Sequence, residues 1–197
     1  MRTVIFAVFA VLFVAGFAIA EDWEWNSTHT MDAMPTGYGT PTGWGTYSIG
    51  TVWNNYGGEI ILTELGFPCS GPSAVDWVIW NDVGGYSPPS GDPTSADETG
   101  QFTPTDTNPG HVPTAYSYID LTGEDIVIAD DAYLCFGYEN PGACGLVDDT
   151  GFEETWSWYG GAWDEDSLSG ANAVLQVKAN HTAIQPTSLG VVKAMYK

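Results

Sequence analysis

The stretch Trp156-Ser-Trp-Tyr-Gly-Gly-Ala-Trp163 decides the fold, because it holds both strands and the turn of a β-hairpin. Its two consecutive glycines, Gly160 and Gly161, supply the positive φ angles that a twisted two-residue turn requires. Such a turn sets Trp158 directly opposite Trp163, and the residue after Trp158 opposite the residue before Trp163. The register therefore predicts that these two tryptophans meet on one side of an antiparallel sheet.

Segments on either side of the hairpin share its two-residue period. Residues 47–53 alternate large and small or polar side chains, as in a half-buried strand. Further β-rich runs, separated by turn signals, are 59–67, 75–80, 116–121, 124–129, 132–138 and 172–179. The prolines of residues 84–114 indicate a long surface connection or an interrupted edge.

These eight or nine short strands indicate an all-β fold, because no segment beyond the first 20 residues has a helical period. The order of strands and turns predicts a two-sheet antiparallel sandwich over residues 45–180. We expect a jelly-roll-like sandwich, and an immunoglobulin-like one is the alternative. The chain has 9 Trp, 10 Tyr and 24 Gly, and this aromatic content argues against disorder.

Residues 1–20 have the three parts of a secretory signal peptide. Arg2 is followed by an apolar run over residues 4–17 and by Ala18-Ile19-Ala20, which predicts cleavage between Ala20 and Glu21. The alternative, an uncleaved anchor, is disfavoured because the run is shorter than the roughly 20 residues that span a bilayer. We therefore expect a secreted or cell-surface protein with no membrane span after cleavage. Residues 21–44 would form an irregular Gly/Pro/aromatic lead-in, and 181–197 a linker and tail.

Charge excludes two classes of partner. The chain has 25 Asp and Glu against 4 Lys and Arg, for a formal net charge of −21. Such a surface repels nucleic acid and anionic lipid headgroups, because phosphate binding needs clustered Lys and Arg. Acidic turns also suggest calcium, which takes six to eight oxygen ligands. Asp164 and Asp166 are the candidate ligands of a structural Ca²⁺, and the alternative is a solvated acidic rim.

The three cysteines allow one disulfide in an oxidising compartment. Cys135 and Cys144 flank a run that has the pattern strand, turn, strand. A hairpin symmetric about Glu139 and Asn140 would set the two cysteines opposite each other, so we expect a Cys135–Cys144 bridge. Pro141 weighs against a tight turn there, and the alternative is three buried thiols.

Several short motifs carry a resemblance when they are taken in order. They include Val78-Ile-Trp-Asn-Asp-Val-Gly-Gly85, Leu134-Cys-Phe-Gly-Tyr-Glu139 and the hairpin. This set resembles a loosely defined group of β-sandwich accessory modules in large secreted proteins of environmental bacteria. The resemblance covers most of residues 45–180, and it implies a surface module without an assigned activity.

The last ten residues differ from the body of the chain. Ser188-Leu-Gly-Val-Val-Lys-Ala-Met-Tyr-Lys197 resembles a short C-terminal tail of some secreted bacterial proteins, although lysine replaces the arginine that usually ends it. The resemblance implies a sorting or anchoring signal. The alternative is a frayed terminus or a last edge strand.

Two site hypotheses follow from particular side chains. One hypothesis concerns three tryptophans of the hairpin, Trp156, Trp158 and Trp163. If these side chains are exposed, they would form a stacking platform for a sugar or an apolar partner. If they are buried, they would be part of the hydrophobic core. A glycoside hydrolase needs two carboxylates that flank the scissile bond, and the candidates are Asp76, Glu139 and Glu153 or Glu154. No spacing in the sequence compels such a pair.

The sequence lacks the residue patterns of nucleophilic and zinc-dependent catalysis. His29, His111 and His181 lie far apart, there is no nucleophile elbow, and no zinc-ligand spacing is present. The leading hypothesis is therefore a non-enzymatic surface module without an organic cofactor, which binds a glycan, a protein or its own copies. The alternatives are a small acidic glycoside hydrolase and a subunit of an extracellular polymer.

Overall fold

The computed structural model describes residues 21–26, 46–107, 113, 115–139, 147–148, 155–165 and 172–181. The strands are β1 (Glu21–Asn26), β2 (Tyr47–Trp53), β3 (Ile60–Phe67), β4 (Val75–Trp80), β5 (Glu98–Phe102), β6 (Ser117–Asp120), β7 (Val127–Ile128), β8 (Tyr133–Glu139), β9 (Val147–Asp148), β10 (Thr155–Tyr159), β11 (Ala162–Glu165), β12 (Asn172–Ala173) and β13 (Gln176–His181). A short 3-10 helix, η1 (Pro93–Ser95), lies between β4 and β5. No helix in these ranges is long and apolar enough to cross a membrane.

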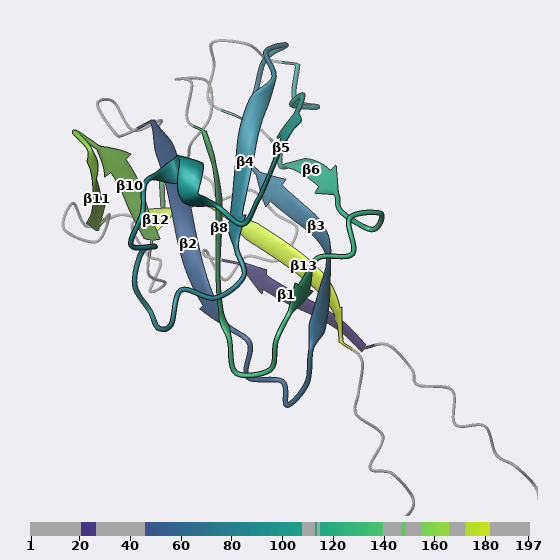
Figure 1. Cartoon of the computed structure of the whole chain (residues 1–197). Coiled ribbons are helices and arrows are strands. Elements are labelled where there is room, and N and C mark those ends of the chain that lie inside the picture. Colours follow the sequence, from purple (N-terminus) through teal and green to yellow (C-terminus); the bar gives the residue numbers. More distant parts are fainter. Residues whose placement is uncertain are drawn as a thin grey trace, which may run out of the picture.

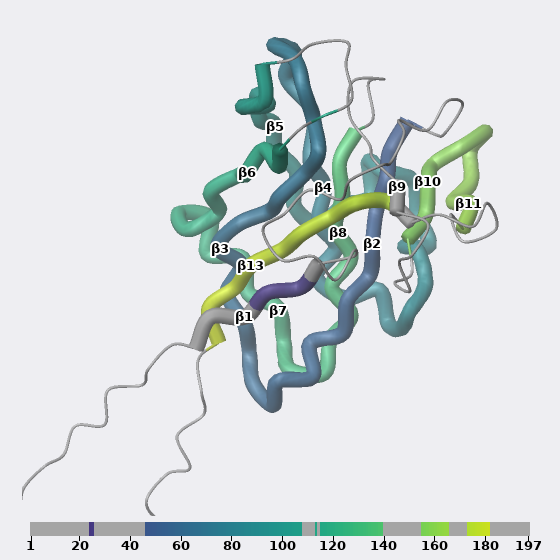
Figure 2. Tube along the Cα trace, turned by 180° about the vertical axis from the view of Figure 1, so that it is seen from behind, coloured from purple at the N-terminus to yellow at the C-terminus, as the bar shows by residue number. Residues whose placement is uncertain are grey.

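The strands form two main antiparallel sheets. The six-stranded sheet has the order β11-β10-β2-β8-β4-β5. The five-stranded sheet has the order β1-β13-β3-β6, and β7 also pairs with β3. Figures 1 and 2 show the molecule from opposite sides, with the six-stranded sheet in front in Figure 1 and β13 and β1 in front in Figure 2. The expected all-β sandwich is confirmed.

The pairing of the strands is nested, which is the pattern of a jelly roll. β1 pairs with β13, β2 with β8, β3 with β6, and β4 with β5, so the earliest strands pair with the latest. A chain that folds back on itself as one long hairpin and then rolls up gives this order. In an immunoglobulin-like sandwich the first two strands share a sheet, whereas β1 and β2 lie in different sheets here. The β10–β11 hairpin extends the six-stranded sheet beyond β2.

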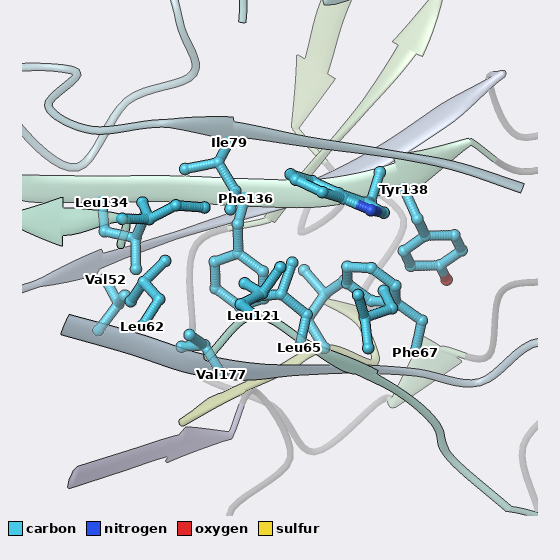
Figure 3. Close-up of a cluster of buried hydrophobic side chains, with 14 of the residues drawn as sticks. Val52, Leu62, Leu65, Phe67, Ile79, Leu121, Leu134, Phe136, Tyr138 and Val177 are labelled. Carbon is cyan, nitrogen blue, oxygen red and sulfur yellow. The ribbon is translucent and has the colours of Figure 1, made fainter. Parts of the chain in front are cut away.

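The main core fills the space between the sheets, as Figure 3 shows. On β8, the alternate residues Leu134, Phe136 and Tyr138 point inward and are fully buried. The ring centroid of Phe67, from the facing sheet, lies 4.6 Å from that of Tyr138 and 6.4 Å from that of Phe136. Burial of each such side chain stabilises the fold by roughly 1.5–3 kcal/mol. This two-residue alternation is what the sequence predicted for these runs.

A second, smaller core, which we call the outer core, lies on the outer face of the six-stranded sheet, the face that points away from the five-stranded sheet. Its buried members are Ile49, Val78, Trp80, Cys135 and Trp156. The connection between β4 and β5, including η1, folds over them, and Figure 1 shows it in front of β2. Residues 84–97 of the proline-rich region therefore cover the outer face of the six-stranded sheet. Residues 98–102 of the same region form the edge strand β5. The candidate sites described below lie on this outer face, between the sheet and the β4–β5 connection or beside them.

The N-terminal lead-in differs from its prediction. Glu21–Asn26 is not irregular but forms β1, and it pairs along its whole length with β13. Trp25 packs against the main core, with its ring edge-on to Phe136 at a centroid distance of 5.6 Å. The sequence did not indicate this strand because its partner lies about 150 residues later in the chain. Residues 1–20, 27–45 and 182–197, which include the expected leader and tail, lie outside the described ranges.

The expected Cys135–Cys144 bridge is wrong. Cys135 carries a free, fully buried thiol, and Cys69 is the described cysteine that is disulfide-bonded. Cys135 lies in the middle of β8, opposite Thr51 on one side and Trp80 on the other. Both of its lateral neighbours are therefore strands from elsewhere in the chain, not the return strand of its own hairpin. Cys144 lies outside the described residues.

Thiol titration checks this assignment. Because a disulfide uses two of the three cysteines, denaturation without reductant is expected to expose one reactive thiol per chain, in the peptide that contains Cys135. The native protein is expected to react slowly, because burial raises the pKa of the Cys135 thiol to about 12 and the thiolate is the reactive form. Alkylation followed by peptide mass spectrometry measures both. Three reactive thiols after denaturation would contradict the assignment.

Candidate functional site

The aromatic hairpin has the predicted register. Trp158 lies opposite Trp163, and their neighbours Tyr159 and Ala162 are paired. Gly160 has φ 62° and Gly161 has φ 93°, so both occupy the left-handed region that the turn requires. The hairpin extends the sheet because Trp156 pairs with Ile49 of β2.

The three hairpin tryptophans have different surroundings. Trp156 is only 5% exposed in the outer core, so of the two alternatives, stacking platform or core, it belongs to the core. Trp158 and Trp163 are half-buried, with ring centroids 4.9 Å apart. Trp163 also donates its Nε1–H to the carbonyl oxygen of Gly91 at 2.8 Å, and its ring lies 6.0 Å from that of Trp80. Trp163 therefore fastens the hairpin to the β4–β5 connection, and ligand stacking on Trp158 and Trp163 stays a prediction.

The structure describes only one of the two expected calcium ligands. Asp164 is an exposed residue of β11, and Asp166 lies outside the described ranges. The described parts of the chain contain no group of three His, Cys, Asp or Glu side chains that could hold a metal ion. The calcium site therefore stays a prediction.

A row of polar side chains crosses four neighbouring strands at one end of the outer face. Tyr47 of β2 lies opposite Glu139 of β8. The β8–β4 register pairs residue 138 with residue 77, so one further rung sets Glu139 beside Asp76. Asp76 in turn lies opposite Gln101 of β5. Because these residues share one face by the two-residue alternation, they form a continuous polar row.

This row borders a groove of about 430 Å³, which we call the polar groove. Tyr47, Asp76 and Gln101 line it, together with Thr94 of η1 and Thr99 of β5. Gln101 donates its Nε2–H to Asp76 Oδ1 at 2.7 Å, so the carboxylate is held in place. The groove therefore offers hydroxyl, carboxylate and amide groups on a sheet.

The electrostatics of the groove keep one donor protonated. The pKa of Tyr47 is raised, first by burial and then by the negative charges of Glu139 and Asp76. Tyr47 therefore remains a neutral phenol that donates a hydrogen bond well above neutral pH. The negative charges of both Glu139 and Asp76 thus act on the Tyr47 phenol. This agrees with the row of side chains that the strand register describes.

The fold brings together two of the carboxylates that the sequence offered as hydrolase candidates. Asp76 and Glu139 become neighbours on one sheet face, whereas Glu153 and Glu154 lie outside the described residues. Directly opposite residues have Cβ atoms roughly 4.5–5.5 Å apart. Sequence reasoning missed Tyr47 and Gln101, because no local pattern shows which distant strands pair.

No family model, curated protein or solved structure matches the chain. Its function is therefore argued from the polar groove and the rest of the outer face.

Proposed function

We propose that the chain is an exported, non-enzymatic binding module that holds a neutral glycan in the polar groove. The observation that carries this proposal is the row of Tyr47, Asp76 and Gln101 along a groove on the six-stranded sheet. A sugar ring presents several hydroxyl groups, each of which both donates and accepts hydrogen bonds. The groove supplies a phenol donor, a carboxylate acceptor and an amide that does both.

Charge restricts the class of glycan. A net charge of −21 and two carboxylates in the row repel uronate and sulfate groups, so an acidic polysaccharide is disfavoured. A neutral polysaccharide avoids this repulsion, and its hydroxyls gain charge-assisted hydrogen bonds to Asp76. The secretory leader predicted for residues 1–20 would bring the module to where such polymers occur, and a sorting role of the tail belongs to the same proposal.

The carboxylate pair makes glycoside hydrolysis the second candidate. Hydrolysis requires one carboxyl group on each side of the scissile bond. Asp76 and Glu139 instead lie side by side on one sheet face, and Asp76 is held by Gln101. A sugar resting on this face has both groups on the same side of it. Binding without cleavage is therefore the function that the geometry favours.

Retention on insoluble neutral polysaccharides tests the proposal. Asp76→Ala is expected to weaken retention about tenfold, because it removes a charge-assisted acceptor and leaves the Gln101 amide unpaired. Tyr47→Phe, which removes only the hydroxyl group, is expected to weaken it by a smaller factor. Asp164→Ala is the matched control, since it removes an exposed carboxylate outside the groove.

Two results would decide against the proposal. Equal retention of Asp76→Ala and Asp164→Ala would show that the groove does not hold the glycan. Release of reducing ends by the parent protein, abolished by Glu139→Gln, would establish hydrolysis instead.

A further inference from the structure

The outer face carries a second feature at the opposite end of β2, where three aromatic side chains meet. Trp53 of β2 lies opposite Tyr133 of β8, with ring centroids 6.1 Å apart and an angle of 12° between the rings. Tyr86, from the β4–β5 connection, stands nearly perpendicular to Tyr133 at 82° and 5.1 Å. We call these three rings the aromatic corner. Tyr86 is 49% exposed, and the other two rings are half-buried.

Hydrogen bonds to two carboxylates hold the corner in place. Trp53 donates its Nε1–H to Asp131 Oδ1 at 2.9 Å. Asp82 Oδ1 accepts from the backbone N–H of Tyr133 at 3.1 Å and from that of Gly84 at 2.8 Å. The indole N–H is therefore already occupied, and what Trp53 offers to a ligand is the face of its ring.

Each carboxylate uses one oxygen in this way, and both aspartates are exposed. Lys178 is the only Lys or Arg among the described residues, and it lies on the other sheet, 3.2 Å from Glu64. Within the described ranges, no Lys or Arg thus neutralises Asp82 or Asp131. Asp82 also lines a separate cavity of about 360 Å³, together with Trp80 and Ser87, whereas the three rings of the corner do not line it.

We propose that the aromatic corner binds an organic cation of the quaternary ammonium or methylated amine class. Ring faces attract such cations through their quadrupoles, and trimethylated groups also have the apolar surface that fits against rings. Two fixed carboxylates and the strongly negative chain add attraction at short and long range. A neutral sugar would stack on the same rings without using the charge, so the charge is what separates the two ligand classes. This site is distinct from the polar groove and does not depend on the glycan proposal.

A pair of ligands of equal shape tests the role of charge. Choline and 3,3-dimethyl-1-butanol differ by the replacement of the cationic nitrogen with carbon. Titration of the purified protein, followed by the NMR signal of the Trp53 indole N–H, is expected to show choline binding at least tenfold more tightly. Equal affinity for the two ligands, or no shift of the indole signal with choline, would overturn the proposal.

Variants separate the corner from the rest of the face. Tyr86→Ala is expected to weaken choline binding about five- to tenfold, because it removes one of three rings. Asp131→Asn keeps an acceptor for the Trp53 indole but removes the charge, and it is expected to weaken binding of choline alone. Tyr159→Ala is the control, since Tyr159 is an exposed ring of the hairpin. Loss of affinity in the control as large as in Tyr86→Ala would contradict the proposal, and glycan retention is expected to be unchanged in Tyr86→Ala.

Discussion

Replacement of Gly137 with alanine is expected to destabilise the protein by about 3 kcal/mol or more, at the upper end of the usual cost of overpacking, or to prevent folding. A Cβ at this position would overlap the carbonyl oxygen of Ser48 and lie 2.7 Å from the Cα of Ile49. Both atoms belong to the backbone of β2, so no side-chain rotation relieves the contact. Strands β2 and β8 would have to separate at the centre of the six-stranded sheet, beneath the polar groove.

Gly85→Ala is the matched control for this substitution. A Cβ at Gly85 would have no neighbour within 4 Å, and no left-handed φ is required there. We expect its free energy of unfolding to stay within about 0.5 kcal/mol of the parent value. Urea denaturation of both variants measures the difference. Equal midpoints for Gly137→Ala and the parent would show that the two strands tolerate a larger spacing.

Trp156→Ala is expected to cost about 3–5 kcal/mol, the usual effect of removing a large buried ring. Trp156 is enclosed by the outer core, so truncation leaves a cavity between β10 and the β4–β5 connection. Trp158→Ala, two residues later on the same strand, is expected to cost only about 1–2 kcal/mol. Trp158 is half-buried, and its main loss is the ring pair with Trp163.

The two variants have the same chemistry on one strand, so their comparison isolates burial. Urea denaturation followed by circular dichroism measures both free energies without relying on tryptophan fluorescence. A Trp158→Ala variant as unstable as Trp156→Ala would show that the outer core extends to the tip of the hairpin. A Trp156→Ala variant close to the parent would contradict the enclosed position of that ring.

Local patterns in the sequence were sufficient for most of the strands between residues 47 and 179 and for one complete register, but not for β1, β5 or β9. The Gly160-Gly161 turn places Trp158 opposite Trp163 because only two residues separate the strands, and the structure confirms it. The period of two in 47–53 and 132–138 identified β2 and β8, because alternate side chains must face a core. The sandwich class followed from many such runs and the lack of a helical period.

Pairing between distant strands was decided by the tertiary structure alone. β1 has no local signal as a strand, and it joins the sheet as an edge strand by pairing with β13. Cys135 was assigned to a hairpin bridge because sequence proximity favours it, yet β8 runs between β2 and β4, and this places its thiol in the outer core.

The polar groove shows the same division between local and distant information. Tyr47, Asp76 and Gln101 each follow a strand pattern that the sequence shows, but their meeting requires the order β2-β8-β4-β5. The sequence by itself determined which residues alternate, where turns occur and that the surface is acidic, because these depend on neighbours in the chain. The tertiary structure decided which faces meet, because strand order depends on burying both sheets in one core, to which residues throughout the chain contribute.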